Sequence, residues 1–132
     1  MKSFNLKVVT PDGLMFDGEV ESLLVHTDGG DVEFLSGHID YIASLAIGRA
    51  RIKQDGKDRF ASVSGGFVTV SGGAVKLIAI TFEFSENIDT TRARAAKEAA
   101  EAAISHAKDD KALEIASAKL KRALNRLYVA EL

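Results

Sequence analysis

The sequence SENIDTTRARAAKEAAEAAISHAKDDKALEIASAKLKRALNRLYVAEL, residues 85–132, closes the chain and contains neither glycine nor proline. All 11 glycines and the only proline of the protein lie in residues 1–84. Glycine and proline are unfavourable inside a helix, whereas alanine, which is frequent in the closing segment, is the strongest helix former. The composition therefore predicts two structural units, residues 1–84 and residues 85–132, of which the second is helical.

Two stripes of apolar residues predict that residues 85–132 form two helices packed as an antiparallel hairpin. In the first helix the spacing of three and four residues places five alanines on one face: Ala93, Ala96, Ala100, Ala103 and Ala107. In the second helix the same spacing selects Leu113, Ala116, Leu120, Leu124 and Leu127. Asn87 and Asp89 can cap the first helix, and Asp109-Asp110 can cap the second. Because alanine methyl groups bury little apolar surface, we expect this hairpin to come apart easily.

Short apolar runs separated by turn sequences predict that residues 1–84 form an antiparallel β-sandwich or barrel. In the segment IGRARIKQ, residues 47–54, basic residues alternate with apolar ones as in a half-buried strand. Gly65-Gly66 is interpreted as a further pair of hairpin glycines. The clearest turns are Pro11-Asp12-Gly13, Asp28-Gly29-Gly30, Asp55-Gly56 and Ser71-Gly72-Gly73. The predicted fold is thus an all-β N-terminal domain followed by an α-helical hairpin.

The composition of the whole chain excludes several classes of protein. The 132 residues include no cysteine, which excludes disulfides and thiolate metal sites and is typical of a reducing compartment. No apolar run is long enough to cross a bilayer, and the N-terminus lacks the pattern of a secretory signal. A net charge of −2 gives no reason to expect a nucleic-acid partner. These features predict a cytosolic protein that does not insert into a membrane.

The residue types that carry catalysis do not form a recognisable constellation. His26 lies in sequence among Asp28, Asp31 and Glu33, which indicates either a cation site or a solvated turn, and the spacing does not match an EF-hand. His38 follows a loop glycine, but no serine nucleophile elbow accompanies it. The paired glycines precede no Walker lysine. We expect neither a metal site nor an enzyme.

The start of the first predicted helix is a candidate anion site. Arg92 lies in its first turn, where free backbone N–H groups and the helix dipole attract anions. Arg122 and Arg126 are four residues apart on the second helix, and an antiparallel hairpin brings both toward Arg92. Three converging arginines can hold a phosphate group. The residues alone leave open that these arginines are solvated, or paired with Glu83 and Glu86.

Four stretches, taken together and in order, resemble the epsilon subunit of bacterial F-type ATP synthase. They are VVTPDGLMFDGEVESLLV (8–25), GGDVEFLSGHIDYIASLAIGRARI (29–52), SVSGGFVTV (62–70) and IDTTRARA (88–95). The resemblance covers nearly the whole chain. The fold of that family, a sandwich followed by two helices, is the fold that the periodicity predicts independently.

The resemblance implies a noncatalytic subunit of the central stalk. Members of the family bind the gamma subunit and the ring of c subunits, and they couple ion-driven rotation to ATP synthesis. Their helical hairpin can extend along gamma, reach the alpha and beta subunits, and inhibit ATP hydrolysis. The implied location is the cytoplasmic face of the cell membrane, as a peripheral protein without a catalytic cofactor.

The resemblance also implies two sets of site residues. The family motif I/L-D-x-x-R-A matches IDTTRA, residues 88–93, so ATP is expected as a regulatory ligand. The implied ATP-binding residues are Glu83, Ile88, Asp89, Arg92, Ala93, Arg122 and Arg126. The implied stalk or ring contacts are Asp31, Glu33 and His38. The loop around them departs from the family pattern, because Glu33 replaces a glycine, and Ser36 and Asp40 replace prolines.

Two other classes of function stay open on the residues alone. One is a free-standing sandwich that binds a small ligand, but such a module gives no reason for a helical hairpin. The other is a nucleotide-hydrolysing enzyme, against which the absence of a Walker lysine and of metal-binding carboxylates argues.

Overall fold

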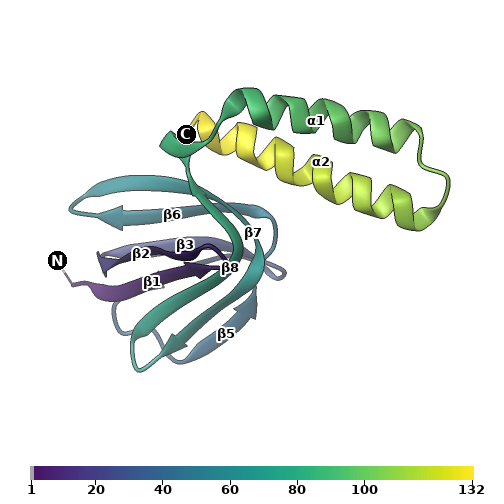
Figure 1. Cartoon of the computed structure of the whole chain (residues 1–132). Coiled ribbons are helices and arrows are strands. Elements are labelled where there is room, and N and C mark those ends of the chain that lie inside the picture. The colour runs from purple at the N-terminus through teal and green to yellow at the C-terminus, as the bar shows by residue number, and fades with distance from the viewer. Residues whose placement is uncertain (1) are drawn as a thin grey trace. The chain divides into compact units, whose positions relative to one another are not determined.

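The computed structural model describes residues 2–132, which divide after Phe84 into two compact units (Figure 1). The first unit contains the strands β1 (Phe4–Thr10), β2 (Gly13–Val20), β3 (Ser22–Thr27), β4 (Gly30–Leu35), β5 (Tyr41–Ser44), β6 (Gly48–Gln54), β7 (Lys57–Ser71) and β8 (Ala74–Phe84). The second contains the 3-10 helix η1 (Ser85–Asn87) and the α-helices α1 (Thr90–Ser105) and α2 (Asp110–Ala130). The predicted fold, a β-sandwich followed by a helical hairpin, is confirmed.

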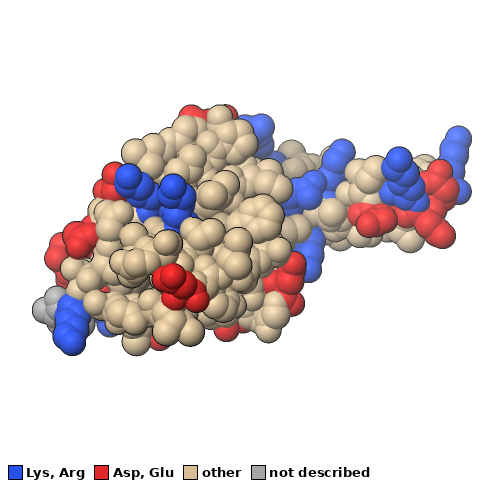
Figure 2. Space-filling view, turned by 90° about the horizontal axis from the view of Figure 1, so that it is seen from below, with Lys and Arg blue, Asp and Glu red and all other residues tan. Residues whose placement is uncertain are grey.

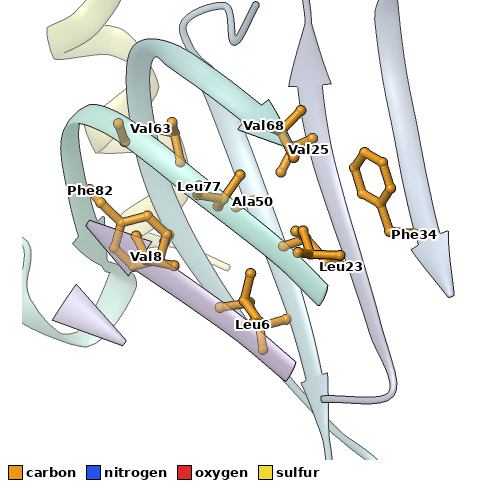
Figure 3. Packing of buried hydrophobic residues seen from close by; sticks show 14 of the residues in the cluster. Leu6, Val8, Leu23, Val25, Phe34, Ala50, Val63, Val68, Leu77 and Phe82 are labelled. Atoms are coloured by element: carbon orange, nitrogen blue, oxygen red, sulfur yellow. The ribbon is translucent and has the colours of Figure 1, made fainter. Parts of the chain in front are cut away.

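The strands of the first unit form one hydrogen-bonded sheet in the order β2-β1-β8-β7-β6-β3-β4, with β5 paired to β7. The pairs are antiparallel except β1 with β8, which is parallel. Leu6 of β1 and Phe34 of β4 come from distant positions in this order, yet both lie in the same buried cluster (Figure 3). The sheet therefore folds over onto itself and encloses its inward side chains as a sandwich does.

The predicted turns lie where the strands reverse. Residues 11–12, 28–29, 55–56 and 72–73 are turns between consecutive strands. Asp55 and Gly56 both have positive φ, 52° and 75°, which is the conformation of a type I′ hairpin turn. These four predictions are confirmed.

The prediction that Gly65-Gly66 forms a hairpin turn is wrong, because both glycines lie inside the 15-residue strand β7. Their φ values are 64° and 105°, outside the range of an ordinary strand. Before them Ala61 and Val63 face the core, and after them Val68 and Val70 do, so the alternation changes phase at the glycines. The two glycines therefore allow β7 to bend and still direct its apolar side chains into the core along both of its halves.

The two α-helices begin at aspartate caps. The side chain of Asp89 accepts a hydrogen bond from the backbone N–H of Arg92 at 3.1 Å, and Asp109 accepts one from Ala112 at 2.7 Å. Each cap satisfies an N–H group that the helix itself leaves unpaired. Asn87, the other predicted cap of the first helix, lies in η1 instead.

Within the second unit α1 and α2 pack against each other along alanines. The buried alanines recur every seven residues and are Ala93 and Ala100 on α1, and Ala116 and Ala123 on α2. The predicted stripes were partly wrong, since Ala96, Ala103, Leu113 and Leu124 are exposed. Alanine occurs on every face of α1, so its sequence does not fix which face is buried. The prediction of a narrow alanine seam is confirmed.

Candidate functional site

The three arginines of the candidate phosphate site lie at the same end of the hairpin. Arg92 is in the first turn of α1, and α2 runs antiparallel to α1 (Figure 1). At about 1.5 Å per residue, Arg126 and Arg122 precede the end of α2 by roughly 6 and 12 Å. Arg92 is exposed, whereas Arg122 and Arg126 are half-buried. η1 packs against α2, so Glu86 belongs to the same end of the hairpin.

The four remaining predicted ATP-binding residues have distinct structural roles. Asp89 caps α1 through its carboxylate, while Ile88 and Ala93 are buried, at 9% and 0% exposure. These three residues fix where α1 starts and leave the Arg92 side chain exposed beside the first turn. Glu83 belongs to the other unit, on β8 opposite Ser62.

The acidic residues predicted to contact a partner, Asp31 and Glu33, lie on strand β4, which corrects the expectation that they lie in a loop. Asp31 accepts hydrogen bonds from His26 Nδ1 at 2.9 Å and from Arg49 at 3.2 Å. Glu33 is paired in the same way with Arg51. The segment thus presents carboxylates that already have basic neighbours on the outer face of β3, β4 and β6.

The pKa of the Asp31 carboxyl lies below its ordinary value of 3.8, mainly because of the hydrogen bond with His26 and also because of Arg49. A lowered pKa in the folded state adds stability above pH 4, and this stability is lost as the pH falls through the lowered value.

Replacing Asp31 by Asn should therefore remove part of the acid destabilisation of the sandwich. Because the pair is exposed, the cost at neutral pH should be about 1 kcal/mol or less. Urea unfolding of both proteins between pH 2 and pH 7 measures the effect. The same pH dependence in both proteins would show that Asp31 does not contribute.

His38 is packed among aromatic rings. Its ring centroid lies 4.8 Å from that of Phe34 and 5.7 Å from that of Tyr41, both in edge arrangements. Its Nδ1 is 2.7 Å from the carbonyl oxygen of Ile39. His38 thus orders the segment between β4 and β5. Within residues 2–132 no group of three or more His, Asp or Glu side chains is arranged to hold a metal ion.

Sequence reasoning missed an apolar face on the outside of the sandwich. Phe67 of β7 lies directly opposite Ile78 of β8, and Ile80 and Ile42 extend the same outward surface. These four side chains, which we call the apolar face, are 45–70% exposed. Figure 2 shows a side of the sandwich on which uncharged side chains predominate. In β8 the sequence signal is that residues 77–80 are all apolar, so both faces of the strand are apolar there. The phase change at Gly65-Gly66 hides which side of β7 is outward.

The comparisons with known proteins agree with this architecture. The beta-sandwich domain of the ATP synthase delta/epsilon chain matches residues 3–85, and the long alpha-helix domain of the same chain matches residues 86–131. This protein therefore belongs to the delta/epsilon chain family of ATP synthase.

Two relatives show which member of the delta/epsilon family this protein resembles. The ATP synthase epsilon chain of Bacillus velezensis is 42% identical over 98% of both chains. The epsilon chain of Bacillus subtilis is also 42% identical over 98% of both. The predicted resemblance to the epsilon subunit is confirmed. Epsilon chains are noncatalytic subunits of the ATP synthase, which agrees with the prediction that this chain is not an enzyme.

Solved structures share the fold. A chain in the structure of Euglena gracilis mitochondrial ATP synthase, OSCP/F1/c-ring, aligns with a TM-score of 0.83 at 24% identity, covering 98% of this chain and 82% of that one. A chain in the central stalk/c-ring structure of Tetrahymena thermophila mitochondrial ATP synthase aligns with a TM-score of 0.62 at 12% identity over 98% and 97%. Among residues 2–132, no helix has the length and apolar character needed to span a membrane.

Proposed function

We propose that this chain is the noncatalytic central-stalk subunit of an F-type ATP synthase, bound to the gamma subunit and the c ring. It couples ion-driven rotation to ATP synthesis as a peripheral protein at the cytoplasmic face of the cell membrane. The observation that carries the proposal is a self-contained sandwich with an apolar face on its surface. The full-length similarity to epsilon chains supports it.

The apolar face has the character of a docking surface for gamma. Ile42, Phe67 and Ile80 are exposed by 70%, 50% and 63%, although each belongs to a well-paired strand. Contiguous apolar surface of this kind is typical of a protein–protein contact. An aromatic residue at the centre of such a surface commonly supplies much of the binding energy.

Placing a charge at the centre of the apolar face should weaken assembly. We expect Phe67→Asp to lower the affinity for gamma at least tenfold, because the carboxylate loses its hydration at the contact. Copurification with gamma, followed by titration of the isolated chains, measures the effect. Leu35→Asp is the matched control, since Leu35 is an equally exposed apolar residue, at 54%, on β4. Equal loss in both variants would contradict docking by the apolar face.

The proposed contact with the c ring involves Asp31, Glu33 and His38. Since both carboxylates already have basic partners within the sandwich, they can offer the ring only weak polar contacts. Loss of one of them should loosen coupling modestly and leave the domain folded.

The hairpin is the proposed inhibitory element. Its helices meet through small residues, so separating them exposes little apolar surface. On α2, Leu113, Leu124 and Tyr128 are already 41%, 45% and 55% exposed. An extended α2 offers these side chains to gamma and to the alpha and beta subunits, and in that position it blocks the rotation that hydrolysis requires.

ATP is the proposed regulatory ligand of the folded hairpin. The site comprises Arg92, Arg122 and Arg126 around the capped start of α1. The closed hairpin gathers the three arginines at one end, whereas an extended hairpin separates them by tens of Å. ATP at about 100 times its dissociation constant would add about 2.7 kcal/mol to the closed state. A ligand shifts a conformational equilibrium only by the difference between its affinities for the two states. Because the three arginines come together only in the closed hairpin, ATP favours the closed state and so relieves inhibition.

A further inference from the structure

Two lysines lie side by side on the outer face of the sheet where β1 and β8 meet. Lys7 of β1 is the in-register partner of Lys76 of β8, and both residues, which we call the lysine pair, are exposed. The residues before and after each lysine are buried in the core, so both lysine side chains are directed outward. Like charges in register on one face of a sheet destabilise the pairing of their strands. The free chain therefore keeps an unfavourable charge arrangement at this place.

The other neighbours of Lys76 on this face carry no charge. Across the strand pair Lys76 is in register with Thr69 of β7, and along β8 its outward neighbours are Ala74 and Ile78. Within residues 2–132 neither lysine of the pair forms an ion pair or a hydrogen bond through its side chain. The charge of Lys76 thus has no counterion in its own sheet.

The acids of this part of the face lie two strands from Lys76, on either side. They are Asp17 and Glu19 on β2, and Asp40 just before β5. At about 4.8 Å between neighbouring strands, this is a separation of roughly 10 Å. Two of the acids already accept hydrogen bonds, Asp17 from Asn5 at 3.2 Å and Asp40 from the backbone N–H of Gly72 at 3.1 Å. A counterion for Lys76 must therefore come from outside the sandwich.

The lysine pair borders the apolar face. Ile78 is the next outward residue of β8 after Lys76 and is in register with Phe67 of β7. On its other side Ile78 is in register with Val9 of β1, which in turn is in register with Leu14 of β2, 60% exposed. An apolar row thus crosses β7, β8, β1 and β2, and the lysine pair runs along one side of it. An apolar centre beside a polar rim is the usual anatomy of a contact between proteins.

We propose that the lysine pair is the charged rim of the gamma contact, and that gamma places at least one carboxylate against Lys76. This contact rests on the proposed docking of gamma at the apolar face, and it specifies the bound surface of gamma as apolar with an acidic flank. A carboxylate there supplies the missing counterion and relieves the repulsion within the lysine pair. Complementary charges at a rim speed association and fix the orientation of the partner. Lys76 therefore sets how gamma is oriented on the apolar face.

The test measures the binding of gamma to full-length variants between about 0.1 and 1 M NaCl, over which the screening length falls from about 10 to 3 Å. Wild-type association should slow several-fold as the salt rises. At the low salt Lys76→Glu should bind about tenfold more weakly or worse, because it sets one carboxylate against another. Lys76→Arg keeps the charge and should bind like the wild type. Lys57→Glu is the matched control, since Lys57 is also exposed and undergoes the same charge change at the start of β7. Equal binding by Lys76→Glu and Lys57→Glu, or wild-type association that does not respond to salt, would overturn the proposal.

Stability separates this contact from a structural role of the lysine. Lys76→Glu replaces a like-charge pair by opposite charges on the same face, so the free variant should be at least as stable as the wild type in urea unfolding. A loss of stability would overturn the proposal, because the charge of Lys76 would then be compensated within the sandwich. Phe67→Asp distinguishes the two contacts. Weak gamma binding by Phe67→Asp with normal binding by Lys76→Glu overturns the lysine contact alone, whereas normal binding by both overturns docking at the apolar face as well.

Discussion

Replacement of Gly66 by alanine is expected to prevent the sandwich from folding stably. A Cβ atom at this position would lie 1.9 Å from the carbonyl oxygen of Ile78 and 2.9 Å from the Cα atom of Ala79, so backbone on β8 would have to move. The φ of 105° is in addition one that side chains rarely adopt. Strain of this kind and overpacking each cost about 1–3 kcal/mol, which together approach the whole stability of a small domain.

Gly72→Ala is the matched control for this substitution. Gly72 also has positive φ, 57°, but no atom lies within 4 Å of a Cβ built there. Only the backbone conformation is penalised, at about 1–2 kcal/mol. Urea unfolding followed by far-ultraviolet circular dichroism compares the two proteins with the wild type. Equal destabilisation by both substitutions would show that β7 and β8 do not approach closely at Gly66.

Removal of everything after Ser85 is expected to separate assembly from inhibition. All residues of the buried cluster lie between Phe4 and Phe84, so the truncated chain keeps its complete core. The apolar face also remains. We therefore expect the truncated protein to unfold cooperatively, to copurify with gamma and the c ring, and to support coupled ATP synthesis. Hydrolysis by the assembled enzyme should rise several-fold, because no helix remains to extend.

Full-length Phe67→Asp serves as the opposite control. It retains the hairpin but should bind gamma at least tenfold more weakly. If docking and inhibition reside in different units, Phe67→Asp is therefore defective in assembly and the truncated chain is defective in inhibition. A truncated chain that does not join the complex would contradict this division. Assembly with unchanged hydrolysis would contradict inhibition by the hairpin alone.

The sequence predicts most of the fold because its strongest patterns are local. The turn Asp55-Gly56 and the cap Asp89 act over a few residues, and both occur where expected. Gly65-Gly66 was misinterpreted because a glycine pair is typical of a turn, and only the strand beside it shows why glycine is needed. The phase of α1 could not be fixed, since alanines such as Ala96 and Ala100 differ only in which helix face they occupy.

In the candidate sites too, features that depend on a few consecutive residues are predicted, and features that depend on strand pairing are not. The motif IDTTRA places Arg92 beside a helix start from sequence alone. The pairing of His26 with Asp31 depends on the register of β3 and β4, which a linear sequence does not show.

Calorimetric titration of ATP into the isolated full-length chain tests most directly whether the closed hairpin is a regulatory site. We expect saturable binding at or below millimolar ATP, and at least tenfold weaker binding by Arg126→Ala, because one charge-assisted contact to phosphate is lost. Arg94→Ala should bind like the wild type, since Arg94 lies two residues from Arg92 and about 200° around α1. Circular dichroism of the free proteins confirms that their helices are intact. No detectable wild-type binding at millimolar ATP, or equal affinity of Arg126→Ala, would leave IDTTRA as a helix start without a ligand.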